Sequence, residues 1–312
     1  MANFRGHLPS QPRPAVLGAA ALSLTLTACA TSAAPAADDD RPLVLTTFTV
    51  IADMVRNVAD DRVQVASITR PGADIHLYEP TPDDLVRGQD ADLIIENGMG
   101  LEAWFRQFTE RLDAPTARIS DGIDPLPITS GDYEGEPNPH AWMSPDNALV
   151  YVDNVRDALT ELDPEGRDTY AQAAADYRER IEEVGAYLDT RLADVPDTSR
   201  ALVTCEGAFS YLARDADLTE MYLWPVNSEG EATPQQTAAV TEFVRDNEVP
   251  ALFCESTVND STQRSVARES GARMGETLYV DSLSDPDGPV PTYLDLIRHD
   301  AEAIVDGLTG TP

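Results

Sequence analysis

Short apolar runs and amphipathic stretches alternate along the chain from residue 43 onward. Short apolar runs are typical of buried strands, whereas apolar positions three and four residues apart are typical of helices that cover a sheet. In the first half these patterns predict strands at 43–48, 63–68, 93–96 and 116–119. Helices are expected at 51–58, from residue 81 and at 101–112. This alternation predicts a parallel sheet with helices on its faces.

The middle of the chain carries the longest amphipathic pattern. Ser144 and Pro145 open one helix, and a second runs from about residue 164 to about residue 193. Its apolar residues follow steps of three and four: Tyr170, Ala174, Tyr177, Ile181, Val184, Leu188 and Leu192. At about 1.5 Å per residue this helix spans roughly 40 Å. We therefore expect a rigid connector between two halves of the protein.

The second half repeats the alternation of strands and helices. Strands are expected at 201–205, 221–224, 251–254 and 278–280. Helices are expected at 208–214, 234–246, 262–269 and 293–308. The two halves together predict an α/β fold with one four-stranded parallel sheet in each half.

The N-terminal residues have the pattern of a processing signal. Arg5 and Arg13 precede a short apolar run that closes at Cys29, and the run is too short to span a bilayer comfortably. A small residue before this cysteine resembles a bacterial lipobox, which implies cleavage before Cys29 and diacylation of its thiol. We expect a signal peptide over 1–28 and a lipid-anchored polar tether over 29–41, with an ordinary secretory peptide as the alternative.

Charge and cysteine content narrow the function classes. The formal net charge is −33 at pH 7, which argues against nucleic-acid binding because phosphates would be repelled. We attribute this acidity mainly to solubility outside the cell. After Cys29 only Cys205 and Cys254 remain, and each directly precedes a glutamate. An exported protein permits a disulfide between them, but two buried free thiols are equally compatible with the sequence.

Histidine is scarce, and two of the histidines lie in proline-marked loops. Beyond the leader the chain has only His76, His140 and His299. Ligands of open parallel sheets bind outside the carboxyl ends of the strands. His76 and His140 follow strands of the first half, and Glu206 and Asp281 end strands of the second. Two neutral imidazoles and two carboxylates cancel the charge of a divalent ion, so these four residues are the predicted metal ligands.

Each of these residues also has a simpler explanation on its own. The histidines could cap loops or pack in the core, and Glu206 or Asp281 could cap helices. Only their combination favours a metal site. Glu255 also ends a strand and is the main rival ligand, although we interpret it as a structural carboxylate. His299 is expected on the solvated surface. Four protein ligands without an evident open position favour binding over catalysis.

Four segments carry the candidate ligands: 71–82, 138–143, 204–212 and 279–283. In this order they resemble the four metal motifs of the solute-binding lipoproteins of metal-ion ABC transporters, and the similarity extends over 43–308. The resemblance implies an N-terminal lobe at 42–162 and a C-terminal lobe at 195–312, joined by one long helix at 163–194. It also implies a metal between the lobes and a membrane permease and its ATPase as partners.

The same resemblance informs the choice of metal. Zinc-specific members usually have a third histidine where this chain has Glu206, and often a histidine-rich loop, whereas residues 121–136 contain no histidine. The His-His-Glu-Asp set resembles the manganese branch, which includes iron(II) binders. Carboxylate oxygens suit manganese, although zinc would bind the same ligands more tightly. We expect a monomeric, non-enzymatic receptor, lipid-anchored on the outer face of the cytoplasmic membrane, that captures Mn²⁺, with Zn²⁺ or Fe²⁺ as alternatives.

Three other functions remain compatible with parts of the pattern. A metallohydrolase would need an open coordination position and a base, for which Asp74 or Glu255 are candidates. A surface adhesin has no sequence feature of its own here, and a receptor for a siderophore or organic solute would need an aromatic-lined cleft. For the metal receptor, affinity should fall below about pH 6.5 because protonated imidazole cannot coordinate. The continuous helix should limit lobe closure.

Overall fold

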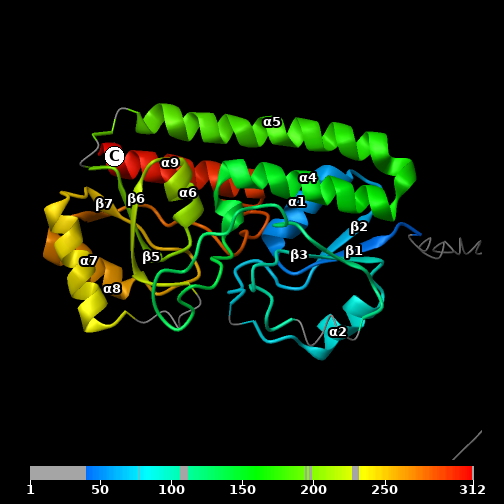
Figure 1. Ribbon diagram of the computed structural model, residues 1–312, viewed down its shortest axis with the longest axis horizontal. Helices are drawn as coiled ribbons and strands as arrows, with labels where there is room; N and C mark the ends of the chain where they lie inside the picture. Colours follow the sequence, from blue (N-terminus) through cyan, green and yellow to red (C-terminus); the bar gives the residue numbers. More distant parts are fainter. Residues whose placement is uncertain are drawn as a thin grey trace, which may run out of the picture. The chain divides into compact units, whose positions relative to one another are not determined.

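The computed structural model describes residues 40–310 apart from 77, 106–111, 194, 197–198 and 227–231. The expected signal peptide, Cys29 and residues 30–39 of the tether lie outside the described residues. The described residues from Arg41 onward form one compact unit, so the lobe boundaries expected at 162 and 194 stay predictions. Within this unit two groups of parallel strands are flanked by helices, and one long helix runs along both (Figure 1).

The first sheet contains four parallel strands in the order β2-β1-β3-β4. The strands are β1 (Leu43–Thr46), β2 (Gln64–Ser67), β3 (Leu93–Glu96) and β4 (Thr116–Arg118). Between them lie α1 (Thr49–Ala59) and α2 (Pro82–Gln89). Thr81 and Asp84 form a capping box at the start of α2, which fixes where the chain re-enters a helix after the loop that follows β2. The four predicted strands of this half and the two helices between the first three strands are confirmed.

The helix expected at 101–112 is not found where the structure describes the chain. Residues 101–105 form turns, and 106–111 lie outside the described residues. The backbone enters this segment with positive φ angles at Gly98, Met99 and Gly100, a left-handed conformation that interrupts regular helix. The Glu102 carboxylate accepts the N–H groups of Asn97 and Gly98 at 2.7 and 3.0 Å, which stabilises the turn instead of a helix.

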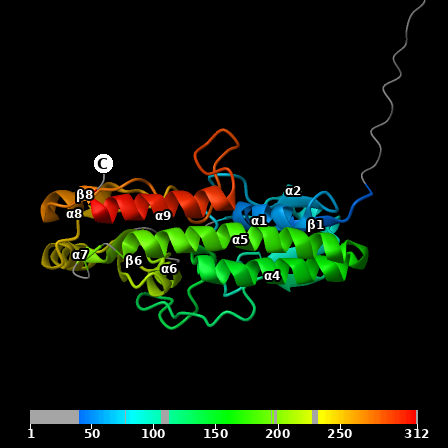
Figure 2. The ribbon, with the colours of Figure 1, turned by 90° about the horizontal axis from the view of Figure 1, so that it is seen from above.

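The predicted connector helix is confirmed, and it packs against helices from both halves of the protein. Helix α4 (Pro145–Leu162) leads through a short 3-10 turn into α5 (Arg167–Leu192), which is 26 residues long. The buried side chains of α5 are those that the apolar pattern predicted. Helix α5 packs against α1, α4 and α9 (Tyr293–Thr309). In Figure 2, α1 and α9 lie along one side of α5 and α4 lies along the other.

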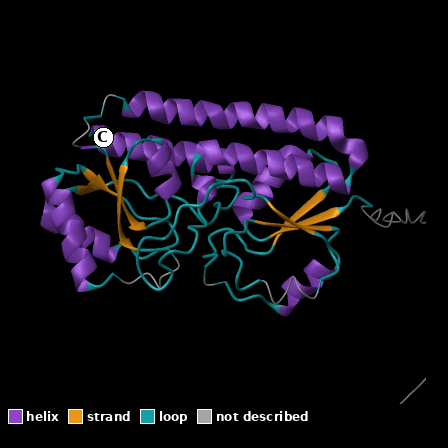
Figure 3. Cartoon of the chain, in the orientation of Figure 1, coloured by secondary structure: helices purple, strands orange, loops and turns teal. Residues whose placement is uncertain are grey.

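The second group of strands is built from two parallel pairs. Strand β5 (Ala201–Glu206) pairs with β6 (Thr219–Trp224), and β7 (Ala251–Leu252) pairs with β8 (Arg273–Met274). The N–H of Phe253 donates to the carbonyl of Val203 at 2.8 Å, and the Gln263 amide donates to both Val203 and Phe253 carbonyls. These bonds join the two pairs, so the four strands lie side by side (Figure 3).

Helices α6 (Ser210–Asp215), α7 (Pro234–Asp246) and α8 (Ser261–Ser270) surround these strands close to their predicted positions. The strand expected at 278–280 was wrong, since only Leu278 forms a parallel bridge, to Glu255. The next backbone groups bond to side chains instead. The N–H of Tyr279 donates to Asp300 at 3.0 Å, and the carbonyl of Val280 accepts the indole N–H of Trp142 at 3.2 Å. Over the described part of the chain, no helix is both long and apolar enough to cross a bilayer.

Candidate metal site

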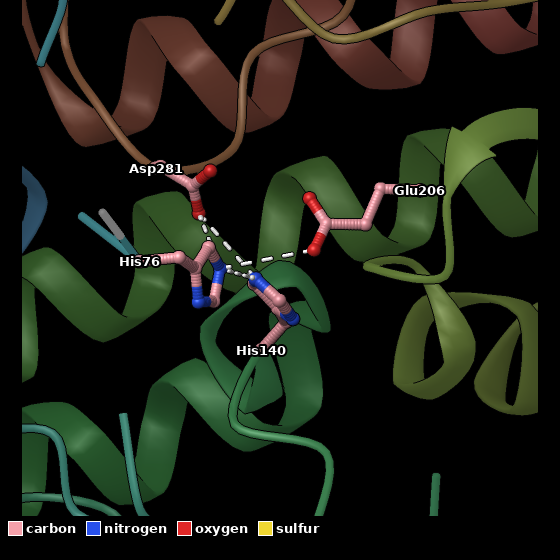
Figure 4. A group of neighbouring side chains, drawn as sticks. All are labelled: His76, His140, Glu206 and Asp281. Carbon is pink, nitrogen blue, oxygen red and sulfur yellow. Dashed lines mark hydrogen bonds and ion pairs between the residues drawn. The ribbon is translucent and has the colours of Figure 1, made fainter. Parts of the chain in front are cut away.

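His76 lies in the loop between β2 and α2. The loop turns at Gly72, whose φ of +76 is a left-handed conformation suited to glycine. The Asp74 carboxylate then accepts the N–H of His76 at 2.8 Å, a side-chain to backbone bond typical of tight turns. This turn aims the His76 ring toward His140 and Asp281 (Figure 4).

His140 is fully buried just before a short 3-10 turn, Ala141–Met143. The side-chain oxygen of Asn138 accepts the backbone N–H of His140 at 3.1 Å and faces the ring Nδ1 at 3.0 Å. Because an amide oxygen only accepts, Nδ1 carries the proton and Nε2 presents a lone pair. The lone pair points toward the other three candidate side chains (Figure 4).

The two carboxylates come from the other group of strands. Glu206 is the last residue of β5, and Asp281 follows the bridge at Leu278. Burial alone would raise the pKa of Asp281, but the adjacent imidazoles of His140 and His76 lower it below its ordinary value. Asp281 therefore favours the charged form in which a carboxylate coordinates a cation.

The four side chains meet within one small volume. Their candidate ligand atoms all lie within 4.8 Å of one another. Nε2 of His76 is 3.1 Å from Nε2 of His140 and 3.8 Å from an oxygen of each carboxylate, and Nε2 of His140 is 3.4 Å from Asp281. Four ligands at about 2.1 Å from one ion would lie about 3.4 Å apart in a tetrahedron. The side chains are at most 9% exposed, so the arrangement suits one desolvated dication.

Glu255, the expected rival, does not join this group of ligand atoms. Its two oxygens accept the backbone N–H of Glu206 at 3.4 and 3.3 Å. Burial, together with the neighbouring Glu206 carboxylate, raises the pKa of Glu255 well above its ordinary value. Glu255 therefore supports the backbone of Glu206, and its burial favours the neutral form, as suits a structural carboxyl group.

The remaining sulfur and imidazole groups are engaged elsewhere. Cys205 and Cys254 form a disulfide with 4.9 Å between their Cα atoms, so neither offers a thiolate to a metal. His299 is half-buried rather than solvated: its Nε2 lies 2.9 Å from the carbonyl of Thr277, and its ring packs on Tyr279. Asn138 was not among the predicted site residues, and its only signal in the sequence is its place in the Asn-Pro-His segment.

The protein has two α/β lobes that are linked by one long helix, and two imidazoles and two carboxylates are buried where the lobes meet. This combination is typical of the metal-binding receptors that serve ABC transporters. The family model of the periplasmic component A of zinc-uptake complexes, ZnuA, matches residues 44–307. The chain therefore belongs to this family. The predicted family, fold class and receptor function are confirmed.

The chain is similar to relatives named for different metals. It is 51% identical over 265 residues to the iron-binding protein YfeA of Yersinia pestis, which covers 85% of each chain. A Mn-bound periplasmic metal binding protein from Candidatus Liberibacter asiaticus matches with a TM-score of 0.81 and 40% identity, over 86% of this chain and 100% of that one. The periplasmic zinc binding protein TroA of Treponema pallidum matches with a TM-score of 0.79 and 27% identity, over 86% and 99%.

The comparisons also bear on partners and location. Substrate-binding proteins of this family work outside the cytoplasm with a permease and an ATPase. Several relatives carry the word lipoprotein in their names.

Proposed function

We propose that this receptor captures one divalent metal ion at His76, His140, Glu206 and Asp281 and delivers it to an ABC permease. The observation that carries this proposal is the close approach of two imidazoles and two carboxylates in a buried position. The donors cancel the charge of a dication, which removes the penalty of an unpaired buried ion. The two candidate bases are engaged with the backbone, Asp74 with the N–H of His76 and Glu255 with the N–H of Glu206, and we propose a non-enzymatic role.

Manganese is the proposed cargo, with iron(II) and zinc as the competing candidates. The carboxylate half of the donor set suits manganese, while imidazole also suits zinc and iron. The relatives support this range, since one is named for iron, one structure holds manganese and another is named for zinc. Mn²⁺, Fe²⁺ and Zn²⁺ are therefore the three candidates, and titration must rank them.

The test is titration of metal-free protein with Mn²⁺, Fe²⁺ and Zn²⁺, each followed by elemental analysis of the desalted sample. One ion per chain is expected, with loss of binding in His140→Ala and Asp281→Ala. His299→Ala is the matched control because this histidine bonds to Thr277 away from the donor set, and it should bind as wild type does. Affinity should fall as the pH is lowered, since an imidazole must lose its proton to coordinate. Binding that persists in both ligand variants would refute the site.

Lipid attachment at Cys29 and a monomeric state complete the proposal. The lipobox pattern and the lipoprotein names of relatives support the anchor. Labelling cells with a radioactive fatty acid should mark the wild-type chain and leave Cys29→Ser unmarked. Sedimentation of the purified protein should give one chain per particle with and without metal, and a dimer at micromolar concentration would contradict that part of the proposal.

A further inference from the structure

The Asn138 side chain contacts both halves of the candidate site. It is 2% exposed. On one side its oxygen accepts the backbone N–H and the ring Nδ1–H of His140. On the other side its nitrogen donates to the carbonyl of Gly207 at 2.8 Å and to the hydroxyl of Ser210 at 3.2 Å. One amide group therefore bonds to His140, a proposed ligand of the first lobe, and to Gly207, the neighbour of the proposed ligand Glu206 in the second lobe.

The chemistry of these partners fixes the orientation of the amide. The backbone N–H of His140 can only donate, and the carbonyl of Gly207 can only accept. A flipped amide would place its NH₂ group against the N–H of His140 and its oxygen against the Gly207 carbonyl, which would lose both bonds. The bonds to Gly207 and Ser210 hold the Asn138 nitrogen, so the Asn138 oxygen must face His140. That oxygen in turn keeps the proton of His140 on Nδ1.

The C-terminal partners of Asn138 are themselves held in place. Gly207 directly follows Glu206, and its N–H donates to the carbonyl of Trp224 at 3.1 Å. A side chain at Gly207 would meet the Tyr222 ring at 2.9 Å, so this backbone lies tightly on β6. The Ser210 hydroxyl donates onward to the Glu220 carboxylate at 2.7 Å. The bond from Asn138 therefore ends on a fixed surface rather than on a mobile loop.

We propose that Asn138 is a positioning residue that couples the two halves of the metal site. Its oxygen keeps His140 in the tautomer that presents Nε2, and its nitrogen ties the His140 loop to the backbone that follows Glu206. This inference rests on the proposed function, in which His140 and Glu206 bind the same ion. Partners of metal-binding histidines are worth about 10- to 100-fold in affinity, so the effect is large enough to measure.

Two variants separate the two roles of the amide. Asn138→Ala removes every bond of the side chain. Asn138→Asp keeps an oxygen for His140 but cannot donate to Gly207 or Ser210. The matched control is Asn154→Ala, because the Asn154 amide also donates to two backbone carbonyls, those of Ile119 and Asp121, at 2.8 and 2.9 Å. These bonds lie away from the four proposed ligands.

The first readout is ¹⁵N NMR of the histidine rings in metal-free protein, which reports tautomers directly and which a merely structural role would not change. Wild type, Asn138→Asp and Asn154→Ala should show His140 protonated on Nδ1 alone. Asn138→Ala should show a mixture of tautomers. If Asn138→Ala leaves the His140 tautomer unchanged, the tautomer role is overturned. Because no metal is present, this result stands apart from any failure of the proposed function.

The second readout is the dissociation rate of Mn²⁺ into excess chelator. Both variants at position 138 should release Mn²⁺ faster than wild type, because both lose the bonds to the C-terminal lobe. Asn138→Ala also loses the partner of His140 and should release Mn²⁺ at least about tenfold faster. Asn154→Ala should release it at the wild-type rate. A wild-type rate in Asn138→Asp would overturn the coupling role. Absence of Mn²⁺ binding in the wild-type protein itself would instead refute the proposed cargo.

Discussion

The two halves of the candidate site are held in different ways. The imidazoles lie on loops, and each is oriented by a neighbouring polar side chain, Asp74 for His76 and Asn138 for His140. Glu206 instead ends a strand, one residue after a cysteine that a disulfide joins to the next pair of strands. The imidazole half therefore depends on hydrogen bonds that set ring direction. The position of Glu206 depends instead on the strand β5 and on the disulfide beside it.

Hydrogen bonds between the halves flank the other carboxylate as well. On one side of Asp281 the carbonyl of Val280 accepts the Trp142 indole N–H. On its other side the hydroxyl of Ser282 accepts the N–H of Gly72, in the His76 loop, at 2.7 Å. The Asp281 carboxylate is thus tied through its two neighbours to both imidazole loops, so hydrogen bonds as well as the four candidate ligands join the halves.

The largest expected effect on metal binding comes from removing a single donor, either from the carboxylate half or from the imidazole half of the site. Asp281→Asn and His76→Gln should each weaken Mn²⁺ binding by more than about 100-fold, since even partners that touch only the ligands are worth about 10- to 100-fold. The two variants should differ in their preference between manganese and zinc. Asp281→Asn should shift preference toward zinc and His76→Gln away from it, because carboxylate suits manganese and imidazole suits zinc.

Competition titration of Mn²⁺ against Zn²⁺ in both variants measures this difference. His299→Gln serves as the control for loss of an imidazole outside the site and should keep the wild-type ratio. Equal changes of the Mn²⁺ to Zn²⁺ preference in both variants would mean that the imidazole half and the carboxylate half contribute the same chemistry.

A second prediction concerns the disulfide of the carboxylate half. The bond closes a separation of 49 residues, so replacing both Cys205 and Cys254 by alanine should lower the free energy of unfolding by about 2–4 kcal/mol. Urea unfolding of metal-free protein measures the loss. Wild type treated with a thiol reductant should approach the double variant, while the double variant itself should not respond to reductant. A response of the double variant would point to another target.

A third prediction concerns how stability depends on pH. It uses two carboxyl groups, one in the N-terminal half of the protein and one in the C-terminal half. Burial raises the pKa of Glu220 to about 7, and burial also raises that of Glu102 to about 7. The folded protein then retains protons that the unfolded chain releases near pH 4.5, so stability falls as the pH rises from about 4.5 to about 7. Glu220→Gln should remove about 1–3 kcal/mol of this fall.

Urea unfolding at several pH values follows the effect, and Glu102→Gln provides the matching measurement for the N-terminal half. Each variant should flatten part of the slope, and the double variant should flatten more than either. A slope that neither substitution changes would show that other groups dominate the pH dependence of stability in this window.

The smallest expected effect is the loss of one bond between the halves. Ser282→Ala removes the hydroxyl that accepts the Gly72 N–H at 2.7 Å and lies 3.4 Å from the Thr49 hydroxyl, while the Leu283 carbonyl can still accept that N–H at 3.3 Å. The variant should lower the free energy of unfolding by about 1 kcal/mol. Ser265→Ala is the control, because the Ser265 hydroxyl on α8 donates only within its own helix, to Ser261. Denaturant unfolding compares the two. If Ser265→Ala costs as much as Ser282→Ala, the Gly72 bond has no special part in joining the halves.

Much of the fold and of the candidate donor set followed from local patterns. The stripe on α5 and the apolar strands could be predicted because burial imposes a repeat of 3.6 residues on a helix and continuous apolar runs on covered strands. The candidate ligands followed from their places at strand ends, since parallel strands gather these ends at one edge.

What could not be predicted depends on contacts between distant segments. Asn138 meets Gly207 and Ser210 only after folding, and no spacing along the chain reveals such a pair. Tyr279 and Val280 look like a strand in sequence, but their backbone groups bond to Asp300 and Trp142. The disulfide likewise required the adjacency of β5 and β7 that the Phe253 bond reveals.

The spread of the four side chains along the sequence has a consequence for export. A chain that has emerged through the secretion channel only as far as residue 205 offers the two imidazoles without either carboxylate. The complete donor set exists only after the segment around Asp281 has arrived and folded. We therefore expect the proposed cargo to be bound by all four side chains only once the chain has folded as far as Asp281.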